Sequence, residues 1–194
     1  MSSIKGWCLA TVIASGCGGG GGGSSAGSVD GTVHGAPFAI ADVVSGVLSI
    51  TDMSGGTLHE AAIWMSSTPN ACSDLAANIA HPNQQFVVIG LATINGATAD
   101  APTAPGAFTI VPSTTIAYWT ASSLDGTCRA PNALVAKGTG GTVELTGANS
   151  EAYAGTFDVQ LDSGEHVTGD FDSTACAAVA TTLSETNHVT PTCQ

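Results

Sequence analysis

The clearest hydrophobic pattern in the chain lies between residues 152 and 172, where apolar and polar side chains alternate along two successive runs. The apolar positions of these runs are Tyr153, Phe157, Val159, Leu161, Val167 and Phe171. A period of two predicts strands that bury one face. The loop Asp162-Ser163-Gly164 would join them as a three-residue hairpin turn, which places Gly164 in the left-handed conformation and Val159 opposite Val167.

Short runs rich in Val, Ile, Thr and Ala, separated by turn residues, continue this pattern over the rest of the chain. The expected strands are 29–34, 38–44, 46–52, 58–66, 85–94, 107–111, 115–121, 134–137, 142–146, 152–161 and 165–172. The run at 85–94 is nearly all apolar in its middle, which is typical of a central strand. The pattern predicts a mostly β protein with one antiparallel sandwich or barrel-like domain and one or two short helices.

One segment has helical periodicity instead. Thr68 can cap it, Pro69 suits its first turn and Pro82 ends it. The apolar stripe at i, i+3, i+4 and i+7 consists of Cys72, Leu75, Ala76 and Ile79. A weaker helix is expected at 175–183.

The amino-terminal residues have a different composition. One lysine precedes an apolar run at residues 6–13, which is far shorter than the ~20 residues that span a bilayer. Ala14-Ser-Gly-Cys17 and six glycines follow. A charged start, an apolar run and small residues are the parts of a secretory signal. A glycine and serine tract cannot pack a core and behaves as a flexible tether.

The residues that end at Cys17 resemble the lipobox of bacterial lipoprotein precursors, with Ala14 where leucine is usual. The resemblance implies cleavage after Gly16, a diacylglyceryl group on the Cys17 sulfur, an acylated amino terminus and, because Gly18 follows, the outer membrane. The expected division is a signal peptide at 1–16, a lipidated cysteine and tether at 17–28, and one β domain at 29–194. The alternative is an ordinary signal peptide cut near Ala14 or Gly16.

The charge balance limits the possible partners. The chain has 15 acidic and 3 basic residues, a net charge of −12, so it repels nucleic acid and anionic lipid surfaces. Only 9% of the residues are charged and 43% are hydrophobic, which is the opposite of a disordered composition. The expected contact with a membrane is therefore the amino-terminal lipid, and the partner is an unidentified envelope or extracellular ligand.

Four cysteines remain in the domain: Cys72, Cys128, Cys176 and Cys193. An even number in an exported protein predicts two disulfides, and we expect the pairs 72–128 and 176–193. The first pair would clamp the helix to a distant loop, and the second would close a short carboxy-terminal loop. The competing interpretation, a metal site, lacks C-x-x-C spacing and nearby histidines. No cofactor is expected.

Catalytic motifs are weak. His59-Glu60-Ala-Ala-Ile63 lacks the second histidine of the H-E-x-x-H zinc motif and lies in an expected strand. The sequence has no G-x-S-x-G elbow and no nucleotide-binding glycine pattern in a strand–helix context. We therefore expect a non-catalytic binding or structural domain. The alternative is a hydrolase of glycan or peptide with Asp158 and Asp170 as acid and base.

Two further clusters are candidates for binding. The hairpin carries a possible calcium site, whose members are Asp158, Asp162, Glu165, Asp170 and Asp172. The alternative is a solvated outer face, with Asp158 opposite Thr168 and Asp170 opposite Thr156.

The aromatic residues Trp64, Tyr118, Trp119 and Tyr153 would line a carbohydrate or apolar groove, or else pack in the core. The segments 155–159 and 164–172 resemble the closing hairpin of small exported β-rich lipoproteins of Gram-negative bacteria.

Overall fold

The computed structural model of the protein describes residues 26–51, 57–95, 98–111, 117–149, 151–183 and 190–194. The expected signal peptide, Cys17 and most of the expected tether lie outside these residues. Strand β1 begins at Ala26, so the last three residues assigned to the tether belong to the folded domain.

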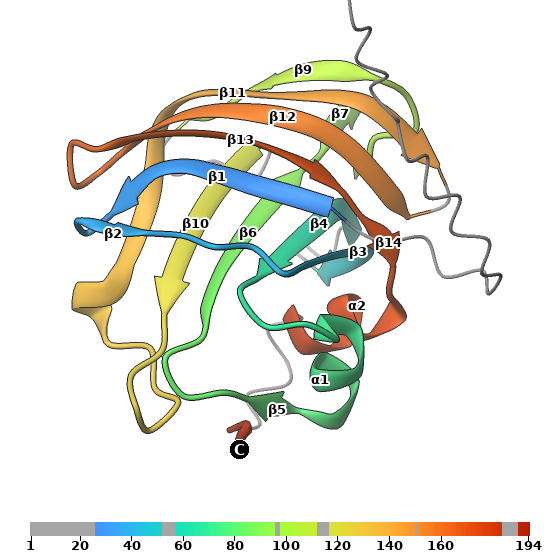
Figure 1. Ribbon diagram of the computed structural model, residues 1–194. Coiled ribbons are helices and arrows are strands. Elements are labelled where there is room, and N and C mark those ends of the chain that lie inside the picture. Colours follow the sequence, from blue (N-terminus) through green and yellow to red (C-terminus); the bar gives the residue numbers. More distant parts are fainter. Residues whose placement is uncertain (1–25, 52–56, 96–97, 112–116, 150, 184–189) are drawn as a thin grey trace, which may run out of the picture.

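A single 11-stranded sheet curls around the main core (Figure 1). Its order is β14-β3-β4-β6-β10-β11-β12-β13-β1-β2, and β9 pairs with β11. The strands are β1 (Ala26–Val33), β2 (Ala36–Pro37), β3 (Asp42–Thr51), β4 (Thr57–Ser66), β6 (Gln85–Leu91), β9 (Gly106–Thr109), β10 (Ala117–Ser123), β11 (Val135–Asn149), β12 (Ala152–Leu161), β13 (His166–Asp172) and β14 (Thr174–Ala175). Two small ladders join β5 (Ile79–Ala80) to β15 (Thr192–Cys193) and β7 (Thr93–Asn95) to β8 (Thr98–Asp100).

The mostly β prediction is confirmed, but the sheet is mixed rather than purely antiparallel. The ladders β14–β3 and β15–β5 are parallel. Only Ser173 separates β13 from β14, so this stretch of chain pairs with β1 at one edge and with β3 at the other. Because β14 continues the direction of β13, it runs parallel to β3. The same stretch of chain thus brings the two ends of the curled sheet together.

The hairpin has the predicted register. Val159 lies opposite Val167, and Asp158 lies opposite Thr168. The N–H of Leu161 donates to the carbonyl of Glu165 (2.8 Å), and Gly164 has a φ of +86°. This left-handed conformation is one that glycine adopts without steric cost. Local alternation and turn chemistry therefore determine this unit.

Two pairs of expected strands are each one continuous strand. The strands expected at 38–44 and 46–52 merge in β3, and those at 134–137 and 142–146 merge in β11. In β11 the register shifts between Gly138 and Gly140 and between Leu145 and Gly147. The glycines thus mark bulges in a bent strand rather than its ends, because pairing on both sides holds the strand together.

The main core fills the inside of the curl. Its largest fully buried side chains include Trp119, Phe171, Ile63 and Met65. The rings of Trp119 and Phe157 pack with centroids 6.0 Å apart. Tyr153 is also buried in this core. The core interpretation is therefore confirmed for Trp119 and Tyr153.

A second, smaller core lies outside the sheet, where two helices cover β3 and β4. Helix α1 (Ala71–Ala77) and helix α2 (Ala177–Leu183) pack there around Val44, Ala62 and Val179. A short 3₁₀ turn, η1 (Asn132–Leu134), precedes β11. Helix α1 is shorter than predicted because Asn70 and Asn78 adopt left-handed conformations at its two ends. Ile79, expected in its stripe, instead pairs with β15.

The disulfide pairing predicted from the sequence is wrong. The bonds join Cys72 to Cys176 and Cys128 to Cys193, with Cα–Cα distances of 5.8 and 5.6 Å. The first crosslinks α1 to the residue before α2, because the helices lie side by side on the sheet. The second holds β15 where it pairs with β5. Both pairings follow from tertiary packing that loop length does not predict.

Candidate functional site

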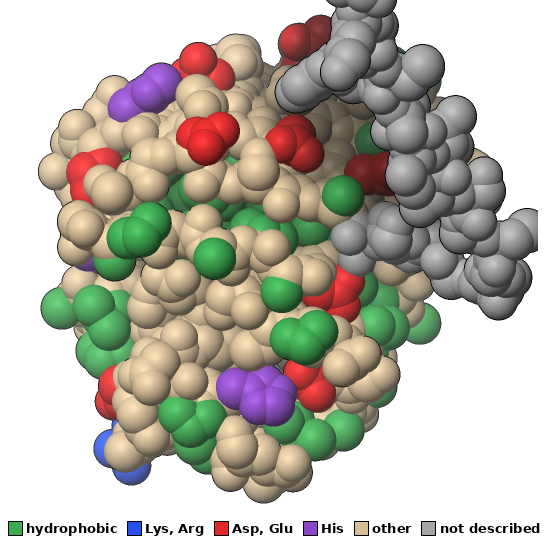
Figure 2. Space-filling view, in the orientation of Figure 1, with side chains coloured by type: hydrophobic (Ala, Val, Ile, Leu, Met, Phe, Trp, Pro, Cys, Tyr) green, Lys and Arg blue, Asp and Glu red, His purple; other side chains and the backbone are tan. Residues whose placement is uncertain are grey.

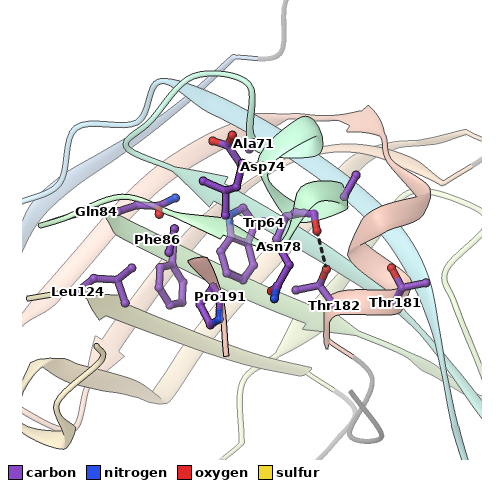
Figure 3. A pocket seen from close by; sticks show the side chains of 14 residues that line it. Trp64, Ala71, Asp74, Asn78, Gln84, Phe86, Leu124, Thr181, Thr182 and Pro191 are labelled. Atoms are coloured by element: carbon purple, nitrogen blue, oxygen red, sulfur yellow. Dashed lines mark hydrogen bonds between the residues drawn. The ribbon is translucent and has the colours of Figure 1, made fainter. Parts of the chain in front are cut away.

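A pocket of about 360 Å³ opens on the outer side of the sheet, between α1, the strands β4 and β6, and the carboxy-terminal segment (Figure 3). Trp64 and Phe86 lie at its centre. Leu75 and Ile79 contribute the side nearest α1, and Leu124 and Pro191 lie at other edges of the lining. This size is near the lower end of the range for small-molecule sites.

Strand alternation turns the two aromatic rings outward. Ile63 and Met65 point into the main core, so Trp64 between them points to the outer face. In the same way Phe86 precedes the core residue Val87. Because Ser66 is the partner of Phe86 across the β4–β6 ladder, the two rings meet diagonally. They stack face to face, with centroids 4.5 Å apart and planes 12° from parallel, so each ring covers one face of the other.

The polar side chains of the pocket mainly bind its own frame. Gln84 is buried; its Nε2 donates to the hydroxyls of Ser66 and Thr68, each at 3.0 Å, and its Oε1 accepts from the N–H of His81 at 3.2 Å. Asp74 Oδ2 lies 2.9 Å from His81 Nε2. These hydrogen bonds hold the wall beside α1 in place and leave the lining predominantly apolar.

The carboxy-terminal wall is attached at several points. Asn78 Nδ2 donates to the carbonyl of Thr190 (3.2 Å), and the N–H of Thr192 donates to the carbonyl of Asn78 (2.9 Å). Pro191 lies between these two residues, and the disulfide to Cys128 follows at Cys193. The last residues of the chain are thus a crosslinked part of the pocket.

A buried carboxylate lies elsewhere on the outer face. Glu60 of β4 is 3% exposed, and Tyr118 Oη donates to its Oε1 at 2.7 Å. Tyr118 reaches Glu60 across Gly90 of β6; a Cβ at Gly90 would lie 2.1 Å from the tyrosine ring, so only glycine allows this contact. Burial raises the pKa of Glu60, and the hydrogen bond from Tyr118 partly opposes that rise. Burial and the neighbouring carboxylate also raise the pKa of Tyr118.

The partial zinc motif is part of a strand, as predicted. Consecutive residues of β4 point to opposite faces, so His59 and Glu60 diverge. His59 Nδ1 lies 3.0 Å from Ser49 Oγ, whereas Glu60 faces Tyr118. The H-E-x-x-H spacing places metal ligands on one face of a helix, but in this strand it does not bring His59 and Glu60 together.

The acidic residues of the hairpin are separated by their partners. Asp158 Oδ1 lies 2.7 Å from His166 Nε2, Asp162 accepts from the N–H of Lys137 at 3.0 Å, and Asp170 accepts from Ser28 Oγ. Asp172 is exposed at the end of β13. Within the residues that the structure describes, no three His, Cys, Asp or Glu side chains form a group able to hold a metal ion.

Glu165 instead joins two turns of the sheet. Its carboxylate accepts from the N–H groups of Gly35 (2.8 Å) and His34 (2.7 Å) and from the hydroxyls of Thr32 (2.7 Å) and Ser163 (2.8 Å). These donors, led by Gly35, lower the pKa of Glu165 to about 2. The carboxylate attaches the turn after β1 to the turn of the β12–β13 hairpin, which is a structural role.

The sequence singled out only part of the pocket. Trp64 was one of four aromatic groove candidates, and it does line the pocket. Tyr118 contacts Glu60 instead, and Trp119 and Tyr153 are in the core. The sequence predicts a buried central strand around Phe86. Because the run is continuously apolar, it does not show which face of the sheet each side chain points to. The stack depends on the register of β4 against β6, which the sequence pattern does not specify.

Comparison of the chain with protein-family models, with curated proteins and with solved structures finds no match. None of the helices in the described ranges has the length and apolar character needed to span a membrane. Figure 2 shows acidic side chains spread over one face of the molecule rather than gathered into one patch. The pocket is therefore the feature on which a functional argument can be built.

Proposed function

We propose that the protein is an exported, lipid-anchored envelope protein whose β domain binds a small ligand and does not catalyse a reaction. The observation that carries the binding role is the pocket around Trp64 and Phe86. A half-buried aromatic stack next to crosslinked walls is a preformed concave surface, and such a surface binds a ligand without a large cost of ordering.

The arrangement of polar groups favours binding over catalysis. Gln84, Asp74 and Asn78 donate to or accept from residues of the pocket frame, so they are not aligned as a nucleophile with a base. Asp158 and Asp170, the acid and base of the alternative hydrolase, lie on the exposed face of the hairpin with different partners. An exposed face does not supply the burial that raises the pKa of a catalytic acid.

The anchor is proposed from the amino-terminal sequence. A lipid on Cys17 and the glycine tract after it would hold the domain near the outer membrane, while the acidic chain avoids anionic headgroups. Two disulfides in the domain support an oxidising compartment outside the cytoplasm. The partner would then be an envelope or extracellular molecule rather than nucleic acid.

Labelling with a palmitate analogue tests the anchor. We expect the wild type to be labelled and to fractionate with membranes, and Cys17→Ser to lose both properties. Cys8→Ser is the matched control, because this cysteine lies in the same segment but outside the lipobox, and it should behave as the wild type. An unlabelled wild type, or a Cys17→Ser protein that keeps its label, would contradict the anchor.

A further inference from the structure

The pocket restricts the chemical class of its ligand. We infer that the ligand is an uncharged small molecule with one or two aromatic rings, which packs against the Trp64–Phe86 stack. This inference rests on the binding role proposed for the pocket and names the kind of molecule bound there.

The stacked rings supply the attraction. Indole and phenyl faces pack favourably against another flat ring, and burial of apolar ligand surface adds to this. The pocket volume of about 360 Å³ is small for a ligand site, so it fits a compact ring system rather than a long chain. Leu75, Leu124 and Pro191 extend the apolar lining beyond the rings.

The polar lining argues against a sugar. A sugar ring also stacks on aromatic side chains, but its hydroxyls need several unengaged hydrogen-bonding partners. Here the amide of Gln84 has three partners, Asn78 Nδ2 donates to Thr190, and Thr182 Oγ1 donates to the carbonyl of Leu75 at 3.4 Å. A bound sugar would therefore find few polar partners for its several hydroxyls, which favours a ring system with fewer polar groups.

Charge argues against ionic ligands. Asp74 is in the lining and the chain has a net charge of −12, so an anion would be repelled. A cation would lose its hydration in a mainly apolar lining where Asp74 already contacts His81, and cation–π attraction to the rings would have to offset that cost. An uncharged ring makes use of the apolar surface without these costs.

Fluorescence binding of 6-propionyl-2-(dimethylamino)naphthalene, an uncharged probe with two fused aromatic rings, tests the inference on the mature protein. We expect saturable binding at one site, and displacement by indole. Trp64→Leu and Phe86→Leu should each weaken binding about tenfold or more, because each removes one ring of the stack that lines the pocket. Ile94→Ala is the matched control: Ile94 is an exposed apolar residue outside the pocket, and its loss should leave binding unchanged. Circular dichroism and the melting temperature of each variant confirm that it is folded.

The other outcomes separate the two proposals. Stronger displacement by N-acetylglucosamine, benzoate or phenyltrimethylammonium than by indole would overturn the ligand class while the pocket remained a binding site. Absence of saturable binding by all of these molecules would overturn both the ligand class and the binding role. Binding that survives in both folded pocket variants but is lost in Ile94→Ala would place the site elsewhere and likewise overturn the inference.

Discussion

At the scale of single residues, Glu60 shows how strongly its surroundings alter a side chain. It lies in an apolar strand segment, is almost fully buried on the outer face of β4, and has Tyr118 as its hydrogen-bond donor. Burial disfavours the charged form of a carboxylate and raises its pKa. Glu60 should therefore make the stability of the domain depend on pH.

The direction of this dependence follows from proton linkage. Below its ordinary pKa of 4.5, Glu60 is neutral in both the folded and unfolded states. Above that value the unfolded chain loses the proton first, so stability falls as pH rises through the raised folded pKa. Glu60→Gln removes this titration. We expect the variant to melt about 2–4 °C above the wild type at about pH 8, with little or no gain at about pH 4.

The matched control for this prediction is Glu144→Gln, since Glu144 is an exposed strand glutamate. Its melting temperature should follow that of the wild type at both pH values. Melting curves measured by circular dichroism decide the matter. A gain for Glu60→Gln that is as large at low pH as at high pH would show that proton release from Glu60 is not its cause.

At the scale of elements, the carboxy-terminal strand β15 holds one edge of the pocket in place. It pairs with β5, is bonded to Cys128 and positions Pro191 in the lining. The other disulfide joins α1 to the start of α2. Each bond thus fixes one covering element to another part of the chain, although the sheet itself is held by its ladders.

Peptide mapping without reduction should find links between Cys72 and Cys176 and between Cys128 and Cys193. The double substitution Cys128→Ser/Cys193→Ser should lower the free energy of unfolding by about 2–5 kcal/mol, as is typical when a native disulfide is removed. It should also weaken probe binding, because the wall at Pro191 loses its covalent attachment. Cys72→Ser/Cys176→Ser, which removes the other disulfide, is the comparison for both stability and probe binding. A map with links 72–128 and 176–193 would contradict this arrangement.

At the scale of the whole molecule, closure of the curled sheet depends on its first strand. Ala26, Gly27 and Ser28 pair with Asp172, Phe171 and Asp170 of β13, and Val29 packs in the main core. These early residues therefore complete the sheet, although their Gly- and Ser-rich composition is typical of a linker.

Truncation tests this role of the first strand. A soluble protein that begins at residue 29 should melt several degrees below one that begins at residue 26, because half of the β1–β13 pairs are lost. A soluble protein that begins at residue 18, and so keeps the six glycines, is the control, and it should melt at the same temperature as the one that begins at residue 26. Equal melting temperatures for the proteins that begin at 26 and 29 would show that the first three residues of β1 do not stabilise the domain.

Features that depend on near neighbours can be predicted from the order of residues alone. Alternation predicted β12 and β13, and the chemistry of a three-residue turn predicted their register and the φ of Gly164. Composition predicted a mostly β domain. These features need only contacts within a hairpin or the periodicity of one strand, so they can be read from the order of residues.

Contacts between residues far apart in the sequence follow from the packing of the folded chain. Cys72 and Cys176 are 104 positions apart and meet only because α1 and α2 pack on the same face of the sheet. Trp64 and Phe86 stack because β4 and β6 pair. Glu60 of β4 accepts a hydrogen bond from Tyr118 of β10, which reaches it across Gly90 of the intervening strand β6. Each of these contacts requires the curled sheet first, since strand order and helix placement, not sequence spacing, bring the side chains together.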